Sequence, residues 1–338
     1  MATSSNPITQ VSATTISPSH GLHQELLTKF ELDLRGTRFQ VDRDTIMNLP
    51  EAIIICLFPS GLAMSRSLGG GAADGGESED EEYVYAVDFD PNCFTYILTF
   101  FRQSQEAFYG TADAPGLFHA QQPLFDQNTH PLPEYVHNPL LKKQPIILLR
   151  EELEYFTIPA KGIKAGADEN GNADKALVDL KIQCGQILVE KNSIFGPLER
   201  NPNRENHVAE QHLIMMLVSS GFKRDDVWGH RSIDPNRCCI SSLSLCLLNA
   251  GIVHTPSADG GVVVTVDNQQ MATSQKLLLF WRKPARKCWW DGQEIELSGP
   301  GEELKSVKLW ARRVWTLELC LVRFPPFFPF IWSFSNCD

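Results

Sequence analysis

The stretch Phe30-Glu-Leu-Asp-Leu-Arg-Gly-Thr-Arg-Phe-Gln-Val41 decides the fold of the first part of the chain. Apolar and polar residues alternate on both sides of Arg35-Gly36-Thr37, and this period of two is typical of half-buried strands. The glycine supplies a tight turn between the two arms. The stretch therefore predicts a β-hairpin.

Further elements are predicted along the next 65 residues or so. The run Tyr83-Val-Tyr-Ala-Val-Asp-Phe89 has the composition and alternation of a strand. Asp90-Pro91 suits the start of a helix that runs to about Gln105. Shorter helices are expected through Leu49 and over 52–57. The longer helix has one apolar face at helical spacing, formed by Phe94, Ile97, Leu98 and Phe101.

Two segments look like insertions. Residues 65–82 are rich in Gly, Ser, Asp and Glu, and residues 109–145 are rich in Pro, His, Asn and Gly. Both are expected to lie at the surface and not to pack as elements. Between the second insertion and the next break, residues 146–158 are predicted to form a helix with Leu148, Leu149, Leu153, Tyr155 and Phe156 as its core side.

A Gly/Ala/Asp-rich linker at 159–175 is the expected domain boundary. After it, Val178-Asp-Leu-Lys-Ile182 alternates as a strand, and 208–219 is an amphipathic helix that ends at Gly221. Strand-like runs then follow at 261–266, 276–281 and 307–322, of which the last is predicted to be a long central strand.

The composition limits the classes of protein and partner. The chain has 338 residues, 43% hydrophobic and 21% charged, which favours two folded domains. Its net charge of −11 disfavours nucleic acid as a partner. The acidic run 77–82 is expected to be solvated, or regulatory through phosphorylation of Ser78. Nine cysteines without a C-x-x-C pair predict free thiols in a reducing compartment. Residues 1–25 lack a signal-peptide core, and the apolar stretch 317–334 is broken by charges and prolines, so no membrane span is expected.

None of the candidate metal sites has the residue pattern that its metal needs. Asp168–Asp174 resembles a calcium loop, but Ala173 stands where the loop needs glycine. His207 and His212 are five residues apart, whereas zinc ligands on one helix face are three or four apart. Cys238, Cys239 and Cys246 have apolar flanks typical of core thiols. We therefore expect no metal and no cofactor, and no catalytic motif is present.

The densest basic and aromatic cluster spans residues 281–290. Trp and Arg are enriched at the energetic centres of protein interfaces. The alternative is a β-hairpin with packed tryptophans and solvated basic residues. Arg312-Arg313 either pair within a strand or extend the basic surface. The candidate partner-binding residues here are Trp281, Arg282, Lys283, Arg286, Lys287, Trp289 and Trp290.

The order of motifs in the first region resembles the BTB/POZ domain of the potassium-channel tetramerisation class. Leu34–Phe39 is similar to that family's hairpin, and Val87-Asp88-Phe89-Asp90-Pro91 stands where the family has an Asp-any-Asp turn. Phe94–Arg102 and Leu149–Phe156 are similar to its later helices. The resemblance implies an assembly surface around Asp88, Asp90, Phe94 and Arg102.

A closer resemblance is to the fungal whiskey-type (Whi) growth regulators. It rests on Asp33–Val41, Leu279–Trp290 and Val307–Leu319. That family acts without catalysis, activates phosphatases in the general stress response and restrains target-of-rapamycin signalling. The aromatic, proline-rich tail after Val322 departs from the family and is either an irregular end or a docking motif.

The predicted fold is an α/β BTB/POZ domain (a three-stranded sheet with helices) followed by a separate α+β domain. The domains are expected at 26–158 and 176–322, with tails at 1–25 and 323–338. The predicted function is a non-enzymatic, cytoplasmic adaptor that a partner recruits to the plasma membrane. The expected partners are a phosphatase or a second copy bound through the BTB domain. The alternative is a cullin-ligase substrate adaptor, and a pocket in the second domain would instead favour an enzyme or a nutrient sensor.

Overall fold

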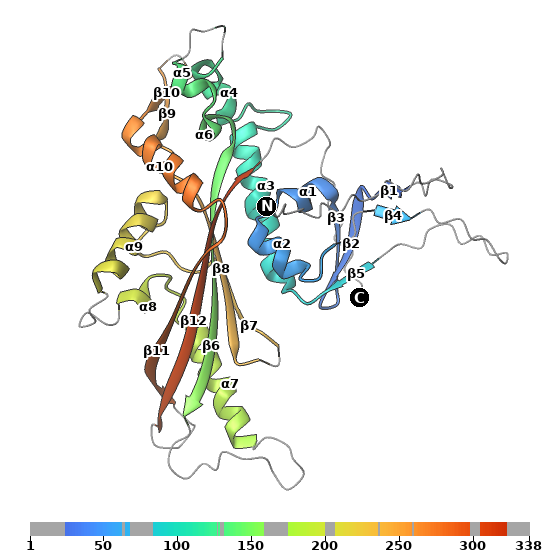
Figure 1. Ribbon diagram of the computed structural model, residues 1–338, viewed down its shortest axis with the longest axis vertical. Coiled ribbons are helices and arrows are strands. Elements are labelled where there is room, and N and C mark those ends of the chain that lie inside the picture. The colour runs from blue at the N-terminus through green and yellow to red at the C-terminus, as the bar shows by residue number, and fades with distance from the viewer. Residues whose placement is uncertain are drawn as a thin grey trace, which may run out of the picture.

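The computed structural model describes residues 24–62, 65–67, 84–126, 128, 132–158, 175–199, 207–235, 237–258, 260–297 and 305–322. Figure 1 shows a small unit of strands and helices at the N-terminal end, which lies against the side of a long twisted sheet. Helices lie along the other side of that sheet.

The small unit is built on the predicted hairpin. β2 (Lys29–Leu34) pairs antiparallel with β3 (Thr37–Asp42), so the hairpin prediction is confirmed. Arg35 and Gly36 have φ of 49° and 91°, a conformation that favours glycine in a two-residue turn. β5 (Val84–Val87) adds in parallel to β2, giving the order β3-β2-β5. A separate pair is formed by β1 (Gln24–Leu26) and β4 (Ser65–Ser67).

Three helices cover the three-stranded sheet. These are α1 (Arg43–Asn48), α2 (Glu51–Leu57) and α3 (Pro91–Tyr109). The predicted start of α3 is confirmed, because Asp90 accepts hydrogen bonds from the N–H groups of Asn92 and Cys93. Its predicted apolar face packs into the core with Phe30, Leu32 and Leu34 of the sheet.

The large sheet has five antiparallel strands in the order β11-β12-β6-β8-β7. Their bounds are β6 (Gln144–Ile158), β7 (His230–Ile233), β8 (Cys239–Leu247), β11 (Ala285–Leu297) and β12 (Lys305–Val322). The long strand predicted at 307–322 is confirmed as β12. It lies second in the sheet, and β6 is central.

The helix predicted over 146–158 is wrong, because this segment is strand β6. Its first half is buried on both faces, so Ile146, Ile147, Leu148 and Leu149 form an unbroken apolar run. Such a run has no period of two and cannot be told from a buried helix by pattern alone. The alternation appears only from Arg150 onward, where one face of the sheet is more open to solvent.

Two further predicted strands are helices. Residues 178–182 lie in α7 (Lys175–Glu190), which buries Cys184 and Leu188 at helical spacing. Residues 276–281 overlap α10 (Asn268–Phe280), whose start is fixed by hydrogen bonds from two N–H groups to Asp267. Runs of five and six residues were too short to distinguish a strand from part of these longer helices. The predicted helix at 208–219 is confirmed as α9 (His207–Ser220), next to α8 (Gly196–Glu199).

The segment 109–145 packs more closely than predicted. It contains α4 (Leu117–Gln121), a 3-10 turn (Gln122–Leu124), α5 (Pro133–Val136) and α6 (Pro139–Lys142). Tyr135, Leu140 and Leu141 are buried in the core shared with α8 to α10. β9 (Ile252–Pro256) and β10 (Val262–Val266) form a hairpin near α4 and α5 (Figure 1), and β10 confirms the strand predicted at 261–266.

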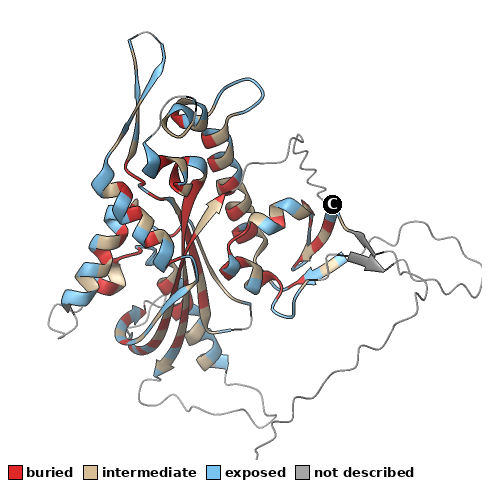
Figure 2. Ribbon diagram, turned by 45° about the horizontal axis from the view of Figure 1, so that its top comes forward, coloured by how far each residue is buried: buried red, intermediate tan, exposed pale blue. Residues whose placement is uncertain are grey.

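The small unit and the large sheet share one core. Ile146, Leu148, Leu243, Leu245 and Val322 from the sheet join the same buried cluster as the hairpin and α3. Figure 2 shows buried residues continuing along the central strands and the faces of the packed helices. Since β6 belongs to the large sheet, the boundary between the two units does not fall after Ile158.

Candidate functional site

A cleft of about 770 Å³ lies where the small unit meets the large sheet. On one side it is lined by α2, β5 and the start of α3, and on the other by β6, β7 and β8. Its charged lining includes Arg35, Asp88, Asp90, Arg150, Asp234 and Arg237. We call this hollow the junction cleft.

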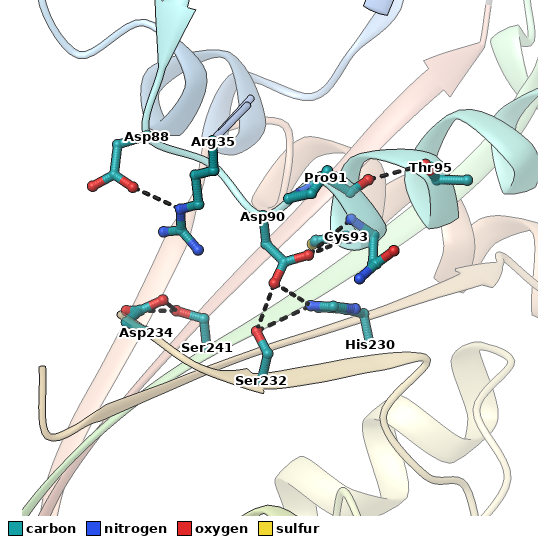
Figure 3. Close-up of polar contacts among 11 residues, drawn as sticks. Arg35, Asp88, Asp90, Pro91, Cys93, Thr95, His230, Ser232, Asp234 and Ser241 are labelled. Atoms are coloured by element: carbon teal, nitrogen blue, oxygen red, sulfur yellow. Dashed lines mark hydrogen bonds and ion pairs between the residues drawn. The ribbon is translucent and has the colours of Figure 1, made fainter. Parts of the chain in front are cut away.

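Asp90 joins α3 to the large sheet (Figure 3). Its Oδ1 accepts hydrogen bonds from Asn92 N at 2.8 Å and Cys93 N at 3.0 Å. Its Oδ2 accepts from Ser232 Oγ at 3.1 Å and lies 3.6 Å from His230 Nε2. One carboxylate therefore caps the helix and also holds strand β7.

The grouping of Ser232, His230 and Asp90 does not match a nucleophilic triad. In a triad the serine and the carboxylate contact opposite nitrogens of the imidazole. Here Nε2 of His230 faces both Ser232 Oγ, at 3.2 Å, and Asp90. Burial lowers the pKa of His230 and outweighs the smaller raising effect of Asp90. The lowered pKa favours the neutral ring. These groups therefore lock the junction and do not activate the serine.

Two more polar contacts hold the small unit on the sheet. Tyr96 Oη on α3 accepts a hydrogen bond from Leu245 N at 3.1 Å. Gly229 makes room for that ring, since a Cβ at this glycine would lie 2.2 Å from Tyr96 Oη. At the other end, Glu318 on β12 accepts hydrogen bonds from the N–H groups of Glu51 and Ala52, each at 2.8 Å. Glu318 thereby caps α2 from the neighbouring unit.

Most charges around the junction cleft are already paired. Arg35 Nε lies 2.7 Å from Asp88 Oδ1, and Arg150 pairs with Glu152. The hydroxyl of Ser241 donates to Asp234, and its Oγ lies 3.1 Å from each carboxylate oxygen. Each of these contacts lies within the small unit or within the large sheet, so the polar links between the two units come instead from Asp90, Tyr96 and Glu318.

A second charged cluster is buried on the opposite face of the sheet. Glu151 on β6 is fully buried and pairs with Arg231 on β7 and Arg313 on β12. Trp315 Nε1 also donates to it, at 3.3 Å. Burial acts to raise the pKa of Glu151, but the two arginines outweigh it and the pKa is lowered. The cluster ties three strands together through one carboxylate.

The structure separates the four residues predicted as an assembly surface. Asp88 and Asp90 reach the junction cleft, and Asp88 is exposed at its rim. Phe94 is fully buried, so its prediction as a surface contact is wrong: the apolar face of α3 that contains it packs against the hairpin. Arg102 is exposed further along α3, and its Nε lies 4.0 Å from Oε1 of Glu106.

The structure also divides the predicted basic-aromatic segment. Trp281 is buried in the core, and its carbonyl accepts a hydrogen bond from Leu319, so it is not a surface contact. Trp289 packs edge-on against Trp315, and Lys287 Nζ lies 5.7 Å from the centre of its ring. The other four residues, Arg282, Lys283, Arg286 and Trp290, are exposed.

The exposed Trp290 belongs to a row of aromatic rings on the sheet. It stacks on Trp310 of β12 at 6.3 Å and on Phe156 of β6 at 6.1 Å. All three side chains keep between 42% and 49% exposure. Arg312, which opposes Trp290 in the sheet, pairs with Glu154, whereas its neighbour Arg313 is buried with Glu151.

Several predictions concern segments outside the described residues: the acidic run 77–82, the loop Asp168–Asp174 and the tails 1–23 and 323–338. Among the residues that the structure describes, no three His, Cys, Asp or Glu side chains are placed to hold a metal ion. No helix within that part is long and apolar enough to cross a bilayer.

Sequence reasoning missed the residues that build the junction: Tyr96, Gly229, His230, Ser232 and Glu318. For Glu318 the local pattern points the wrong way, because its position between Leu317 and Leu319 in an alternating strand predicts a solvent-facing side chain. The partners of Asp90 carried no signal, since they come from a strand 140 residues or so away.

Comparison with known proteins gives the chain its relatives. No protein-family model matches it. A WHI2-like protein of Schizosaccharomyces pombe is 34% identical over 289 residues, which cover 85% of this chain and 86% of that protein. A growth regulation protein of Saccharomyces cerevisiae is 25% identical over 455 aligned positions, covering 86% and 90%. An uncharacterised protein of Schizosaccharomyces pombe is 20% identical and covers 87% of each.

These relatives support one of the two family resemblances and do not test the other. The similarity of the small unit to BTB/POZ domains stays a prediction, because none of the names concerns that domain. The resemblance to the whiskey-type regulators is confirmed by identity along most of both chains. The chain belongs to the WHI2-like family.

Proposed function

We propose that this chain is a non-enzymatic adaptor in growth and stress regulation, which holds a phosphatase and thereby restrains target-of-rapamycin signalling. The coarser part, growth regulation, is supported by the name of the related growth regulation protein of Saccharomyces cerevisiae. The finer part rests on the family resemblance and on one exposed surface.

That surface lies at the end of α10. Leu279 and Phe280 are 77% and 75% exposed, more than any other large apolar side chain in the described part of the chain. The exposed basic residues Arg282 and Lys283 follow directly. We call these four residues the client surface. Adjacent apolar and guanidinium groups are the chemistry of interface hot spots.

The client surface has a rigid support. Trp281, between its apolar and basic halves, is buried, and its backbone accepts a hydrogen bond of 2.7 Å from Leu319. Less conformational entropy is lost on binding when a surface is already fixed. The geometry favours an acidic partner segment with an apolar anchor.

Affinity purification from a native fungal cell, with and without amino-acid starvation, tests this proposal. We expect the wild-type chain to recover a phosphatase in an amount that changes with starvation. Phe280→Ala and the pair Arg282→Glu/Lys283→Glu are expected to lose most of it. Phe156→Ala is the matched control, since it removes an exposed aromatic ring from another surface and is expected to keep the partner.

Three outcomes would contradict the proposal. Recovery of a cullin in place of a phosphatase would favour a ligase adaptor. Full phosphatase recovery by the client-surface variants, or its loss with Phe156→Ala, would place the binding surface elsewhere. Circular dichroism of each variant separates a lost contact from a lost fold.

A further inference from the structure

Strand β11 forms a long, regular edge of the large sheet. It has 13 residues and pairs with β12 from Ala285↔Leu317 to Leu297↔Lys305 without a change of register. Among the described strands it has no neighbour on its other side. Edge strands are normally short, bulged or interrupted by proline, because their free N–H and C=O groups pair with other chains. The opposite edge, β7, has four residues.

The bulkiest exposed side chain of β11 leaves this edge open. The ring of Trp290 stacks on Trp310 and on Phe156, which come from the second and third strands of the sheet. Trp290 therefore leans inward across β12 and away from the free edge. A new strand can approach the backbone without displacing it.

Basic and acidic side chains lie in opposite halves of β11. Its first half contains Arg286 and Lys287, and its second half contains Asp291, Glu294 and Glu296. A strand that is basic at one end and acidic at the other is complementary to an antiparallel copy of itself. We propose that β11 pairs with β11 of a second copy of this chain about a twofold axis at Trp290.

The pairing centred on Trp290 places like residues on the same face of the joined sheet. Arg286 then lies opposite Glu294 of the second copy, and Glu294 opposite its Arg286. On the other face, Asp291 lies opposite Trp289. Opposite charges across a strand pair stabilise it.

A shift of the axis by one residue gives a poorer interface. An axis at Asp291 would place the two Asp291 carboxylates opposite each other, and directly opposed like charges are destabilising. Each Asp291 is buried next to Arg313, with 3.9 Å between their nearest charged atoms, and cannot turn away freely. An axis at Asp291 would still pair Arg286, with Glu296, so the opposed Asp291 carboxylates are what favour the axis at Trp290.

The proposed dimer is isologous and joins two five-stranded sheets edge to edge. The paired segment is 285–295, so the client surface at 279–283 lies outside it. This interface differs from the self-assembly through the small unit that the BTB resemblance implies.

Analytical ultracentrifugation of the full chain tests the dimer by charge exchange. We expect wild type to sediment at twice its mass of 37.9 kDa at micromolar concentration. Arg286→Glu and Glu294→Arg are each expected to weaken association about tenfold or more, because each replaces two attractive pairs with two repulsive ones. The double variant Arg286→Glu/Glu294→Arg restores the pairs and is expected to recover the dimer. A monomeric wild type, or a dimer that all variants keep, would overturn the proposal.

A disulfide at the axis tests the register. In a Cys288→Ser background, Trp290→Cys places two thiols in a directly opposed pair with Cα atoms about 4.5–5.5 Å apart, within disulfide range. Oxidation is expected to give a covalent dimer. Lys287→Cys is the control, since its two copies would lie about 20 Å apart along the strands. Equal crosslinking of both variants, or crosslinking of the control alone, would exclude this register.

Discussion

The carboxylate of Glu318 accepts a hydrogen bond of 2.8 Å from the backbone N–H of Ala52, and so the last strand of the large sheet caps a helix of the small unit. Glu318 is buried, and its other oxygen accepts from Glu51. Since two N–H donors, one buried and one partly buried, depend on one side chain, this contact is a main polar link between the units.

Replacing Glu318 tests that link. Glu318→Ala leaves two N–H groups at the start of α2 without an acceptor, and we expect the free energy of unfolding to fall by about 1–3 kcal/mol. Urea denaturation measures this change. Glu296→Ala, on an exposed position of β11, is the control and should change stability by less than about 0.5 kcal/mol. Equal effects of the two substitutions would contradict the capping role.

Glu151 is expected to be the most sensitive charged position in the sheet. Glu151→Gln leaves Arg231 and Arg313 buried without their main counter-charge, which typically costs about 3–5 kcal/mol. Glu152→Gln removes a partly exposed partner of Arg150 and is expected to cost at most about 1 kcal/mol. Paired unfolding curves at neutral pH compare the two.

The same carboxylate predicts a pH dependence. Because the pKa of Glu151 is lower in the folded chain than its ordinary value of 4.5, its contribution to stability is present above pH 4.5. That contribution is lost as the pH falls through the folded-state pKa. We expect the difference in stability between wild type and Glu151→Gln to shrink in this acidic range. A difference that grew on acidification would contradict the assigned pairing.

Asp90 is predicted to act both as a helix cap and as a tie to β7. Asp90→Ala should lower stability by about 1–2 kcal/mol and speed hydrogen exchange at the start of α3 and in β7. Ser232→Ala removes the tie and leaves the cap, so faster exchange is expected in β7 but not at the start of α3. Faster exchange confined to α3 in both variants would show that the contact with Ser232 contributes nothing.

The cysteines are expected to differ widely in reactivity. Burial raises the pKa of Cys184 to about 11 and that of Cys246 to about 12, so little thiolate forms near neutral pH. Cys288 is exposed on β11. With iodoacetamide at pH 8, peptide mass spectrometry should find Cys288 modified first and the other two only after unfolding. Early modification of Cys184 would mean that α7 detaches from the sheet.

The sequence predicted the elements whose patterns are local. The hairpin at Gly36, the start of α3 at Asp90 and strand β12 all have turn, cap or alternation signals within a few residues. Strand β6 had no such signal in its first half, because the small unit and the helices bury both of its faces. Whether Leu148 belongs to a helix or to a strand is decided by packing against elements that are distant in sequence.

The candidate site was only partly predictable for the same reason. Asp88 and Asp90 were identified from a turn motif and do line the junction cleft. Phe94 and Trp281 are residue types found both at interfaces and in cores, and only the packing decides between the two. Leu279 and Phe280, which dominate the client surface, resemble part of a strand because the cap that starts α10, at Asp267, lies well before this apolar run.

Strand β12 is the last described element, yet it pairs along the whole length of β6, which precedes it by some 150 residues. During synthesis on the ribosome, β6 therefore emerges long before the strand that closes one side of it. Sheets with such distant pairing form late and leave apolar strands uncovered meanwhile. We expect a nascent chain that stops before β12 to be held by chaperones and degraded, so nonsense mutations anywhere upstream should act as complete losses of the protein.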